Sequence, residues 1–158
     1  MEECCCPPPQ ASRRQPCPGC QLSSSVVEPQ TVKALLNDVA MRRFEVDAYY
    51  FCASPACDIV YFALGGGRFL TPDLRVAVWQ KEARGSRTVC YCFGENEAEM
   101  REELMQTGVC HAVSRVREHI AARRCACDIR NPRGTCCLGD VTSAVRDVEA
   151  SIQSAVQS

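Results

Sequence analysis

The sequence is poor in several features on which many proteins depend. Only 6% of its 158 residues are aromatic, and it contains one tryptophan and two histidines. With so few large apolar side chains, we expect the fold to rely on cross-links or metals as well as on a core. Nineteen acidic and eighteen basic residues leave a formal net charge of −1. This balance gives no reason to expect nucleic acid or an anionic membrane surface as the main partner.

Signals for export, membrane insertion and common catalysis are also missing. The start, MEECCCPPPQ, is acidic and proline-rich, without the basic and apolar regions of a signal peptide. No apolar run approaches the ~18 residues that indicate a membrane span. No Ser-His-Asp set, phosphate-binding loop or paired-carboxylate site is evident, so an enzyme acting on an organic substrate is the least favoured class. We therefore expect a cytoplasmic protein that is not an enzyme.

What the sequence has in quantity is cysteine, with fourteen residues. In the cytosol thiols stay reduced, and clustered cysteines there hold metal more often than they form disulfides. Three of them, Cys4, Cys5 and Cys6, lie in a segment that reads as a disordered tail over residues 1–16, because consecutive prolines suit neither a helix interior nor a central strand. They could capture a soft metal such as Cu(I), or have no site-specific role.

The rest of the chain predicts an α+β protein of two small units. Residues 17–86 read as a mixed α+β domain, with a helical apolar stripe over 32–39 and alternating, strand-like segments. The expected strands cover 44–51, 58–62 and 74–82, with a glycine turn at 65–67. Residues 87–158 read as an all-helical domain, with helices expected over 95–106, over 111–124 and from 140 onward.

The first domain contains two close cysteine pairs. Cys17 and Cys20 form a C-x2-C turn, and Cys52 and Cys57 a C-x4-C pair between two expected strands. Two such pairs, brought together by the intervening chain, predict a tetrahedral site in which four thiolates close the shell of a structural zinc ion. The alternatives are that Cys52 and Cys57 are buried apolar residues beside an incidental turn, or that CPGC is a redox motif without its usual strand.

The second domain carries a further set. Cys90 and Cys92 form C-x-C in VCYCFG, and the stretch RCACDIRNPRGTCCLGDV returns with four more cysteines after two expected helices. Two loops at one end of a helical hairpin bring thiolates together, as an iron–sulfur cluster requires. The alternative is a second structural zinc site. Cys110 and His111, which lie apart from this set, read as a buried thiol beside a surface histidine.

These motifs carry a resemblance. The C-terminal half resembles the bacterioferritin-associated ferredoxin-like 2Fe–2S domain. The chain from CPGC through TVKALL, DIVYF, VCYCFG and NPRGTCCLGDV is similar to the N-terminal region of CopZ-type copper chaperones. The resemblance implies one zinc site, one 2Fe–2S cluster, and one-electron chemistry that supports copper handling by reducing Cu(II). Transient copper binding, and a copper chaperone, copper-transporting pump or redox protein as partner, are implied with it.

The resemblance also guides the ligand assignment. Cys90 and Cys92 match the C-x-C of the family directly. For the other two places we expect Cys125 and Cys137, with Cys127 and Cys136 as alternates. The sequence has no counterpart of the C-terminal heavy-metal-associated domain of these chaperones, so we expect the zinc and iron–sulfur region without the copper-transfer domain. A redox-sensing or scaffolding partner with a non-transferring cluster, and a passive metal store or carrier, remain as alternative functions.

Overall fold

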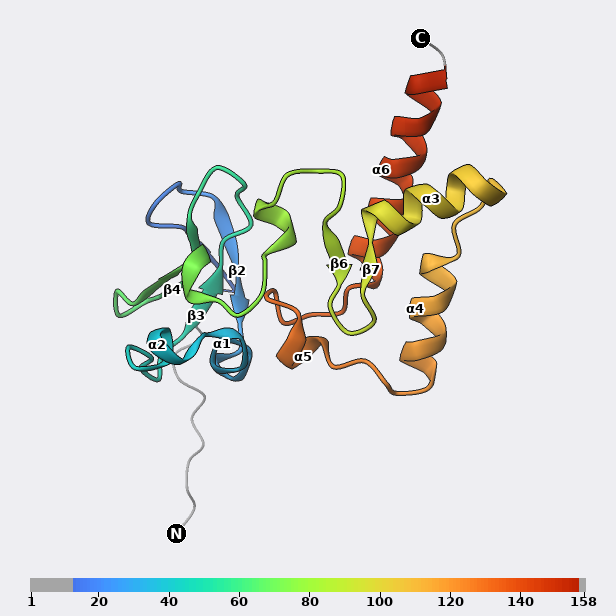
Figure 1. Ribbon diagram of the computed structural model, residues 1–158. Coiled ribbons are helices and arrows are strands. Elements are labelled where there is room, and N and C mark those ends of the chain that lie inside the picture. Colours follow the sequence, from blue (N-terminus) through green and yellow to red (C-terminus); the bar gives the residue numbers. More distant parts are fainter. Residues whose placement is uncertain (1–12, 157–158) are drawn as a thin grey trace.

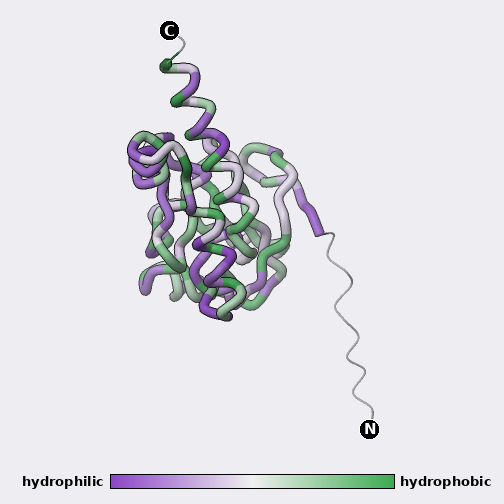
Figure 2. The backbone as a smooth tube through the Cα atoms, turned by 90° about the vertical axis from the view of Figure 1, so that its right-hand side faces the viewer, coloured by the Kyte–Doolittle hydropathy of each residue, from purple (hydrophilic) through white to green (hydrophobic). Residues whose placement is uncertain are grey.

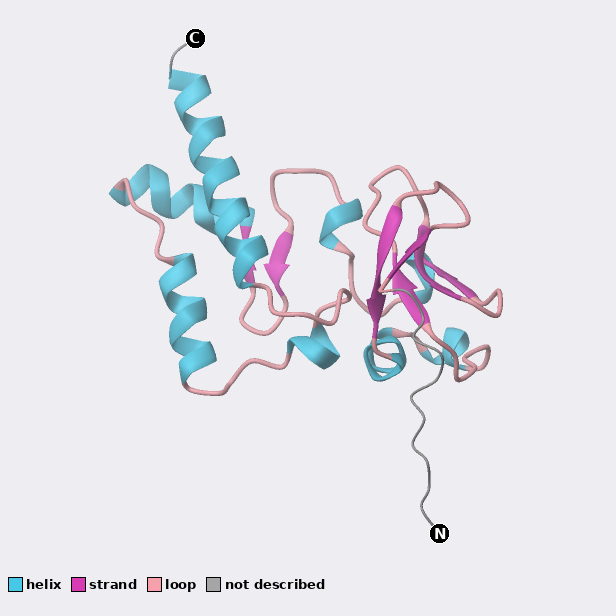
Figure 3. Ribbon diagram, turned by 180° about the vertical axis from the view of Figure 1, so that it is seen from behind, coloured by secondary structure: helices cyan, strands magenta, loops and turns pink. Residues whose placement is uncertain are grey.

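The computed structural model describes residues 13–156, and Cys4, Cys5 and Cys6 lie outside this range. The described chain has two parts that lie side by side, a sheet with short helices and a helical part (Figure 1). Seen from behind, nearly all of the sheet structure lies in the first part and the longer helices lie in the second (Figure 3). None of the helices in residues 13–156 is long and apolar enough to cross a membrane.

The first part is built on a five-stranded antiparallel sheet in which neighbours in sequence are neighbours in space. Its strands are β1 (Arg14–Pro16), β2 (Ser23–Val27), β3 (Tyr49–Phe51), β4 (Ile59–Ala63) and β5 (Arg68–Leu70). Helices α1 (Pro29–Leu35) and α2 (Asp38–Met41) connect β2 to β3. Two short 3-10 helices, η1 (Thr71–Asp73) and η2 (Trp79–Lys81), follow β5. The structure thus places residues 14–16, expected in the tail, in an edge strand.

Both faces of this sheet carry buried side chains: one face forms the apolar core, and the other packs beside cysteines. Tyr49, Phe51 and Tyr61 pack on one face with the apolar residues of α1. Tyr50 and Phe62 point to the other face, where their rings stack with centroids 5.5 Å apart beside Cys17 and Cys52. Successive side chains of a strand alternate between faces. The short run of large apolar residues in β3 and β4 therefore supplies both the core and the wall of a cysteine cluster.

The long helix expected over 32–39 is divided in the structure. Helix α1 ends at Leu35, Leu36 is extended and forms a bridge with Leu74, and Asn37 caps α2 by accepting a hydrogen bond from the Ala40 amide (2.9 Å). Val39, assigned to the apolar stripe, is 70% exposed. An asparagine side chain that satisfies a free helical amide favours a new helix start over continuation, which explains the break.

Two of the expected strands differ more strongly from the structure. The segment 44–51 is a strand only at Tyr49–Phe51, and Val46 is 85% exposed. The segment 74–82 is a loop ending in η2, although Val78 is fully buried in the core. Alternation arises there because single apolar side chains of an irregular loop enter the core, and such a pattern cannot be distinguished from a strand by periodicity alone.

The second part contains four helices and a short ribbon. The ribbon pairs β6 (Thr88–Cys90) with β7 (Glu95–Asn96). The expectation that this part is all-helical was therefore wrong. The helices are α3 (Glu97–Thr107), α4 (Ala112–Ala121), α5 (Cys127–Arg130) and α6 (Leu138–Val156). The stripe of Val141, Val145 and Val148 on α6 is buried as its spacing predicts. The last turns of α6 project beyond the rest of the chain (Figure 2).

The two parts meet where α1 packs against α5 and the loop that follows it. Thr31 on α1 donates a hydrogen bond of 2.6 Å from its hydroxyl to the carbonyl of Asp128. A Cβ atom on Gly134 would lie 2.8 Å from the Thr31 hydroxyl oxygen, and the φ of this glycine is +73°. Only glycine suits this close approach and this backbone conformation. The stretch with four cysteines is therefore held against the sheet domain.

Candidate metal centres

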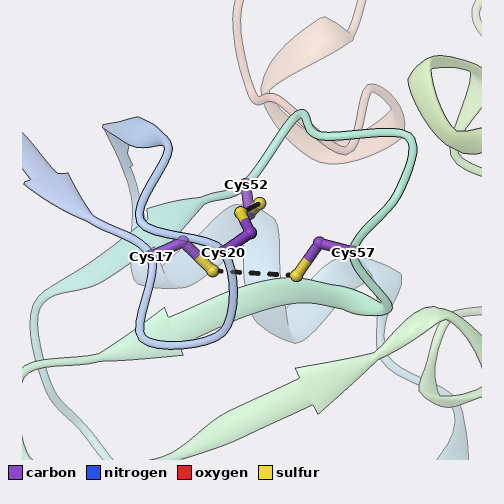
Figure 4. Close-up of side chains that lie close together, drawn as sticks. All are labelled: Cys17, Cys20, Cys52 and Cys57. Carbon is purple, nitrogen blue, oxygen red and sulfur yellow. Dashed lines mark hydrogen bonds between the residues drawn. The ribbon is translucent and has the colours of Figure 1, made fainter.

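The first cysteine set converges from two loops of the sheet domain (Figure 4). Cys17 and Cys20 lie on the tight turn after β1, Cys52 follows β3 directly, and Cys57 precedes β4. Gly19 makes the turn possible, because a Cβ atom there would lie 2.9 Å from the Ile59 Cδ1 atom and 3.2 Å from the Cys57 sulfur. The C-x2-C turn thus approaches the second pair closely enough for four sulfurs to meet.

The distances fit one tetrahedral metal ion. The sulfurs of Cys17 and Cys57 are 3.9 Å apart, those of Cys20 and Cys52 are 3.6 Å apart, and all four lie within 4.8 Å of one another. Four thiolates at the usual Zn–S distance of ~2.3 Å would be about 3.8 Å from each other. The four-cysteine geometry predicted from the two pairs is therefore present in the chain, and with four sulfur ligands it has no open position for a substrate.

The surroundings of these thiols favour a bound cation. Cys17 and Cys52 are fully buried, whereas Cys20 is exposed. Burial raises the pKa of Cys52 to about 12 and also raises the pKa of Cys57. A hydrogen bond from the backbone of Leu22, helped by the neighbouring thiols, lowers the pKa of Cys20 to about 7. Without a cation at least one buried thiol keeps its proton, and a divalent metal that replaces those protons removes the conflict between burial and charge.

Lys81 stabilises the loop that carries Cys52 and Cys57. Its ammonium group donates hydrogen bonds to the carbonyl of Ser54 (2.8 Å) and to that of Cys57 (2.7 Å), so it holds the middle and the C-terminal end of the C-x4-C loop. It also places a positive charge near Cys52, where it lowers the pKa of that thiol against the larger effect of burial. Nothing in the sequence around Lys81 pointed to this role, because the residue lies 24 positions beyond Cys57 on a segment expected to be a strand.

The second cysteine set converges from both sides of the helical part. Cys90 ends β6, Cys92 follows in the turn to β7, Cys127 begins α5, and Cys137 directly precedes α6. The sulfurs of Cys92 and Cys127 are 3.8 Å apart, and the thiol of Cys137 interacts with those of Cys90 and Cys127. The four thiols thus form one connected group in the core of this domain.

The structure does not bring Cys125 and Cys136 into this group. Both are exposed, whereas Cys127 and Cys137 are buried at 8% and 2% exposure. Helix α5 starts at Cys127 and turns its side chain inward, while Cys125 stays in the loop before it. The sequence-based preference for Cys125 as the third ligand does not match this geometry, which favours the alternate Cys127. The sequence-based choice between Cys125 and Cys127 lacked this information, because a helix of only four residues was not predicted to start at Cys127.

The pKa values of the second set, like those of the first, favour a bound metal group. Hydrogen bonds with Cys137 lower the pKa of Cys90 to about 7 and that of Cys127 to about 6. Burial raises the pKa of Cys92 to about 11, and the two neighbouring thiols raise the pKa of Cys137. In addition, the Ala126 amide donates a hydrogen bond of 3.1 Å to the Cys92 sulfur. This donor set fits a group that takes four thiolates and is tuned by amide hydrogen bonds.

The remaining thiol and the two histidines are not part of either set in the described chain. The Cys110 thiol donates to a carboxylate oxygen of Glu103 at 3.6 Å, and burial raises its pKa. His111 is exposed, and its backbone amide also bonds to Glu103. His119 stacks on Phe93 with ring centroids 3.7 Å apart. His111 is thus at the surface as the sequence predicted, whereas Cys110, expected to be buried, is half-buried beside the core of the helical domain.

Comparison with known proteins agrees with this construction. Residues 14–75 match the CopZ family model that is described as a zinc binding domain. This part of the chain is therefore similar to the zinc-binding domain of CopZ proteins. The structure is also similar to the X-ray structure of the Archaeoglobus fulgidus CopZ N-terminal domain, with a TM-score of 0.66 and 27% sequence identity. None of the curated proteins matches the sequence significantly.

The structural similarity extends further along the chain than the match to the family model. The match covers 82% of this chain and 96% of the CopZ N-terminal domain, whereas the family model ends at residue 75. The similarity therefore extends from the zinc-binding domain into the helical part. This confirms the resemblance to the N-terminal region of CopZ-type proteins that the motifs predicted.

Proposed function

We propose that this protein is a metal-binding redox protein that holds a structural zinc ion and a 2Fe–2S cluster and transfers single electrons in support of copper handling. In this proposal Cys17, Cys20, Cys52 and Cys57 hold the zinc ion. The cluster ligands are Cys90, Cys92, Cys127 and Cys137, so Cys127 takes the place first expected for Cys125. When bound, a 2Fe–2S cluster supplies one-electron chemistry.

One observation carries the proposal: two cysteine sets of different construction lie in one chain. In the first set all four sulfurs lie within 4.8 Å of one another, as a single ion requires. The second set is linked as a chain of contacts from Cys90 through Cys137 and Cys127 to Cys92. Four thiolates that serve two metal ions need a more extended arrangement than four that serve one.

The link to copper rests on the resemblance to CopZ-type copper chaperones. In the proposed reaction one electron leaves the reduced protein, and Cu(II) becomes Cu(I). The product Cu(I) prefers thiolate ligands, so a copper-binding protein with soft ligands is the natural recipient. A copper chaperone or a copper-transporting pump is the proposed partner, in the cytoplasm.

Anaerobic purification tests the metal content. A reddish-brown protein with about two iron, two sulfide and one zinc per chain is expected. A colourless protein with zinc in both sites would contradict the iron–sulfur assignment. Reduction by dithionite should produce a one-electron paramagnetic signal, and stoichiometric Cu(II) should abolish it and appear as Cu(I) in a bicinchoninate assay. A cluster that cannot be reduced, or that Cu(II) leaves reduced, would favour the scaffolding or storage alternatives.

A further inference from the structure

An uncompensated group of positive charge lies beside the second cysteine set. Arg123 and Arg124 precede Cys125 in the loop between α4 and α5, and Arg130 ends α5. All three are exposed, and within residues 13–156 none of their side chains makes an ion pair. We call these three residues the arginine patch.

The patch lies on a chain that is nearly neutral as a whole. Five other arginines form ion pairs in the described chain, among them Arg115 with Glu95 and Glu103, Arg87 with Glu97, and Arg133 with Asp140. Asp128 and Glu118 are the acidic residues closest to the patch in sequence, and both are exposed. From Arg117 to Arg130 the chain holds four arginines against these two acids. A local field of one sign therefore remains on a molecule with a net charge of −1.

The patch is close to the cysteine sulfurs. Ala126, two residues after Arg124, donates its amide hydrogen bond directly to the Cys92 sulfur (3.1 Å). Arg130 lies one helical turn after Cys127. The segment between α4 and α5 runs past the turn that joins β6 to β7, which carries Cys92 (Figures 1 and 3). Ile129, beside Arg130 on α5, is 40% exposed and adds an apolar side chain to this surface.

We propose that the arginine patch is the docking surface for an acidic redox protein that exchanges electrons with this chain. The proposal rests on the proposed function, because it needs a redox group at the second cysteine set. Positive charges steer a negatively charged partner toward the loop in which the Ala126 amide contacts the Cys92 sulfur. Electron-transfer complexes use small interfaces and depend on steering for speed, and a three-charge patch fits that scale. The balanced overall charge disfavours nucleic acid.

The test uses the full chain and an acidic flavodoxin as the probe. In the triple variant R123Q/R124Q/R130Q, we expect flavodoxin binding and the rate of electron transfer from its hydroquinone at low salt to fall about tenfold, as for the loss of three exposed charge pairs. The matched control is R13Q/R42Q/R68Q, which removes the same charge from exposed positions of the sheet domain. The control should bind and react within twofold of the wild type. Binding by the wild type should also weaken steeply with rising salt.

Several outcomes would overturn the proposal. Equal effects of the patch and control variants would show that only net charge matters. Tighter binding of a single-stranded oligonucleotide than of flavodoxin, through the same arginines, would assign the patch to nucleic acid instead. Iron and sulfide contents separate this proposal from the function on which it rests. A coloured protein with no patch effect contradicts the docking surface alone, whereas a protein without iron contradicts the redox function, and binding of flavodoxin can still be measured on it.

Discussion

The hydroxyl of Tyr61 donates a hydrogen bond of 2.5 Å to the backbone carbonyl of Pro132, and so ties strand β4 to the loop that connects α5 with α6. Tyr61 is fully buried, and burial raises the pKa of its hydroxyl, which keeps it a neutral donor. Thr31 makes the parallel contact to the carbonyl of Asp128 at 2.6 Å. Two side chains of the zinc-binding domain thus satisfy carbonyl groups of the loop that carries Cys127 and Cys137.

Replacing Tyr61 by Phe should loosen the second cysteine set while leaving the first intact. The variant leaves the buried Pro132 carbonyl without its donor, which costs about 1–3 kcal/mol. We expect the zinc content to stay at the wild-type level, while the visible absorbance of the cluster is lost several times faster in the presence of an iron chelator. The measurement is the half-life of that absorbance under anaerobic conditions.

Tyr49 supplies a matched control for this experiment. Its hydroxyl donates to the carbonyl of Glu45 at 2.6 Å, within the zinc-binding domain. Tyr49→Phe should therefore lower the unfolding temperature without shortening the lifetime of the cluster. If both variants shorten it equally, the contact with Pro132 has no special role in supporting the loop.

The choice between Cys125 and Cys127 gives the second prediction. Cys127→Ser should abolish the cluster colour, because the buried thiol beside Cys92 and Cys137 is removed. Cys125→Ser should retain at least nine-tenths of the iron, since its side chain is exposed. Iron and sulfide analysis of the two variants, each prepared anaerobically, is the measurement. Loss of iron in the Cys125 variant alone would restore the assignment based on sequence.

Much of the helical part could be predicted from its sequence, for a physical reason. Helices α4 and α6 have apolar residues at helical spacing, α3 is rich in helix-forming residues, and Asn96 caps α3 by accepting a hydrogen bond from the Glu99 amide (3.0 Å). These are local signals, formed within a few residues. The strand expected over 58–62 agrees for the same reason, because β4 is a continuous apolar run bounded by turns.

The parts that could not be predicted depend on contacts between distant residues. Strand β2, SSSVV, has little apolar character, and it is held by pairing with β1 and β3. The residues 74–82 alternate like a strand, but Val78 and Trp79 belong to different cores, so the chain crosses between the domains there. The four thiols of the first set could be predicted because two closely spaced cysteine pairs are typical of a shared metal ion. Lys81 could not be predicted, because only the tertiary fold brings it close to them.

Lys81 gives the third prediction. Replacement by Gln removes the ammonium group that binds the carbonyls of Ser54 and Cys57 and brings positive charge to the thiolates. Groups that orient metal ligands from outside typically contribute 10–100-fold to affinity, so zinc should bind about tenfold more weakly. Competition with a chromogenic zinc chelator measures the change. Lys33→Gln is the control with the same loss of charge, because Lys33 lies over the ring of Phe44 instead. Equal weakening in the control would reduce the effect of Lys81 to general charge.

Arg115 gives the last prediction, which concerns pH. Its guanidinium joins three elements by binding both oxygens of Glu95 on β7 (2.6 and 3.0 Å) and both of Glu103 on α3 (3.1 and 3.0 Å). The hydrogen bond with Arg115 lowers the pKa of Glu103 to about 2. Because this is below the unfolded value of about 4.3, the contact stabilises the fold fully above that pH and is lost as the pH falls toward 2.

Arg115→Gln should therefore lower the unfolding temperature by several degrees, and the difference from the wild type should stay constant between pH 8 and pH 6. Below pH 4 the difference should shrink, since protonated Glu103 no longer forms an ion pair with Arg115 in the wild type. Metal release in acid affects both chains alike, so the difference at each pH is the quantity to measure. Arg117→Gln, an exposed neighbour on α4 without an ion pair in the described chain, should show no difference at any pH. A difference for Arg115→Gln that grows in acid would mean that the pairing with Glu103 does not account for the stability that Arg115 contributes.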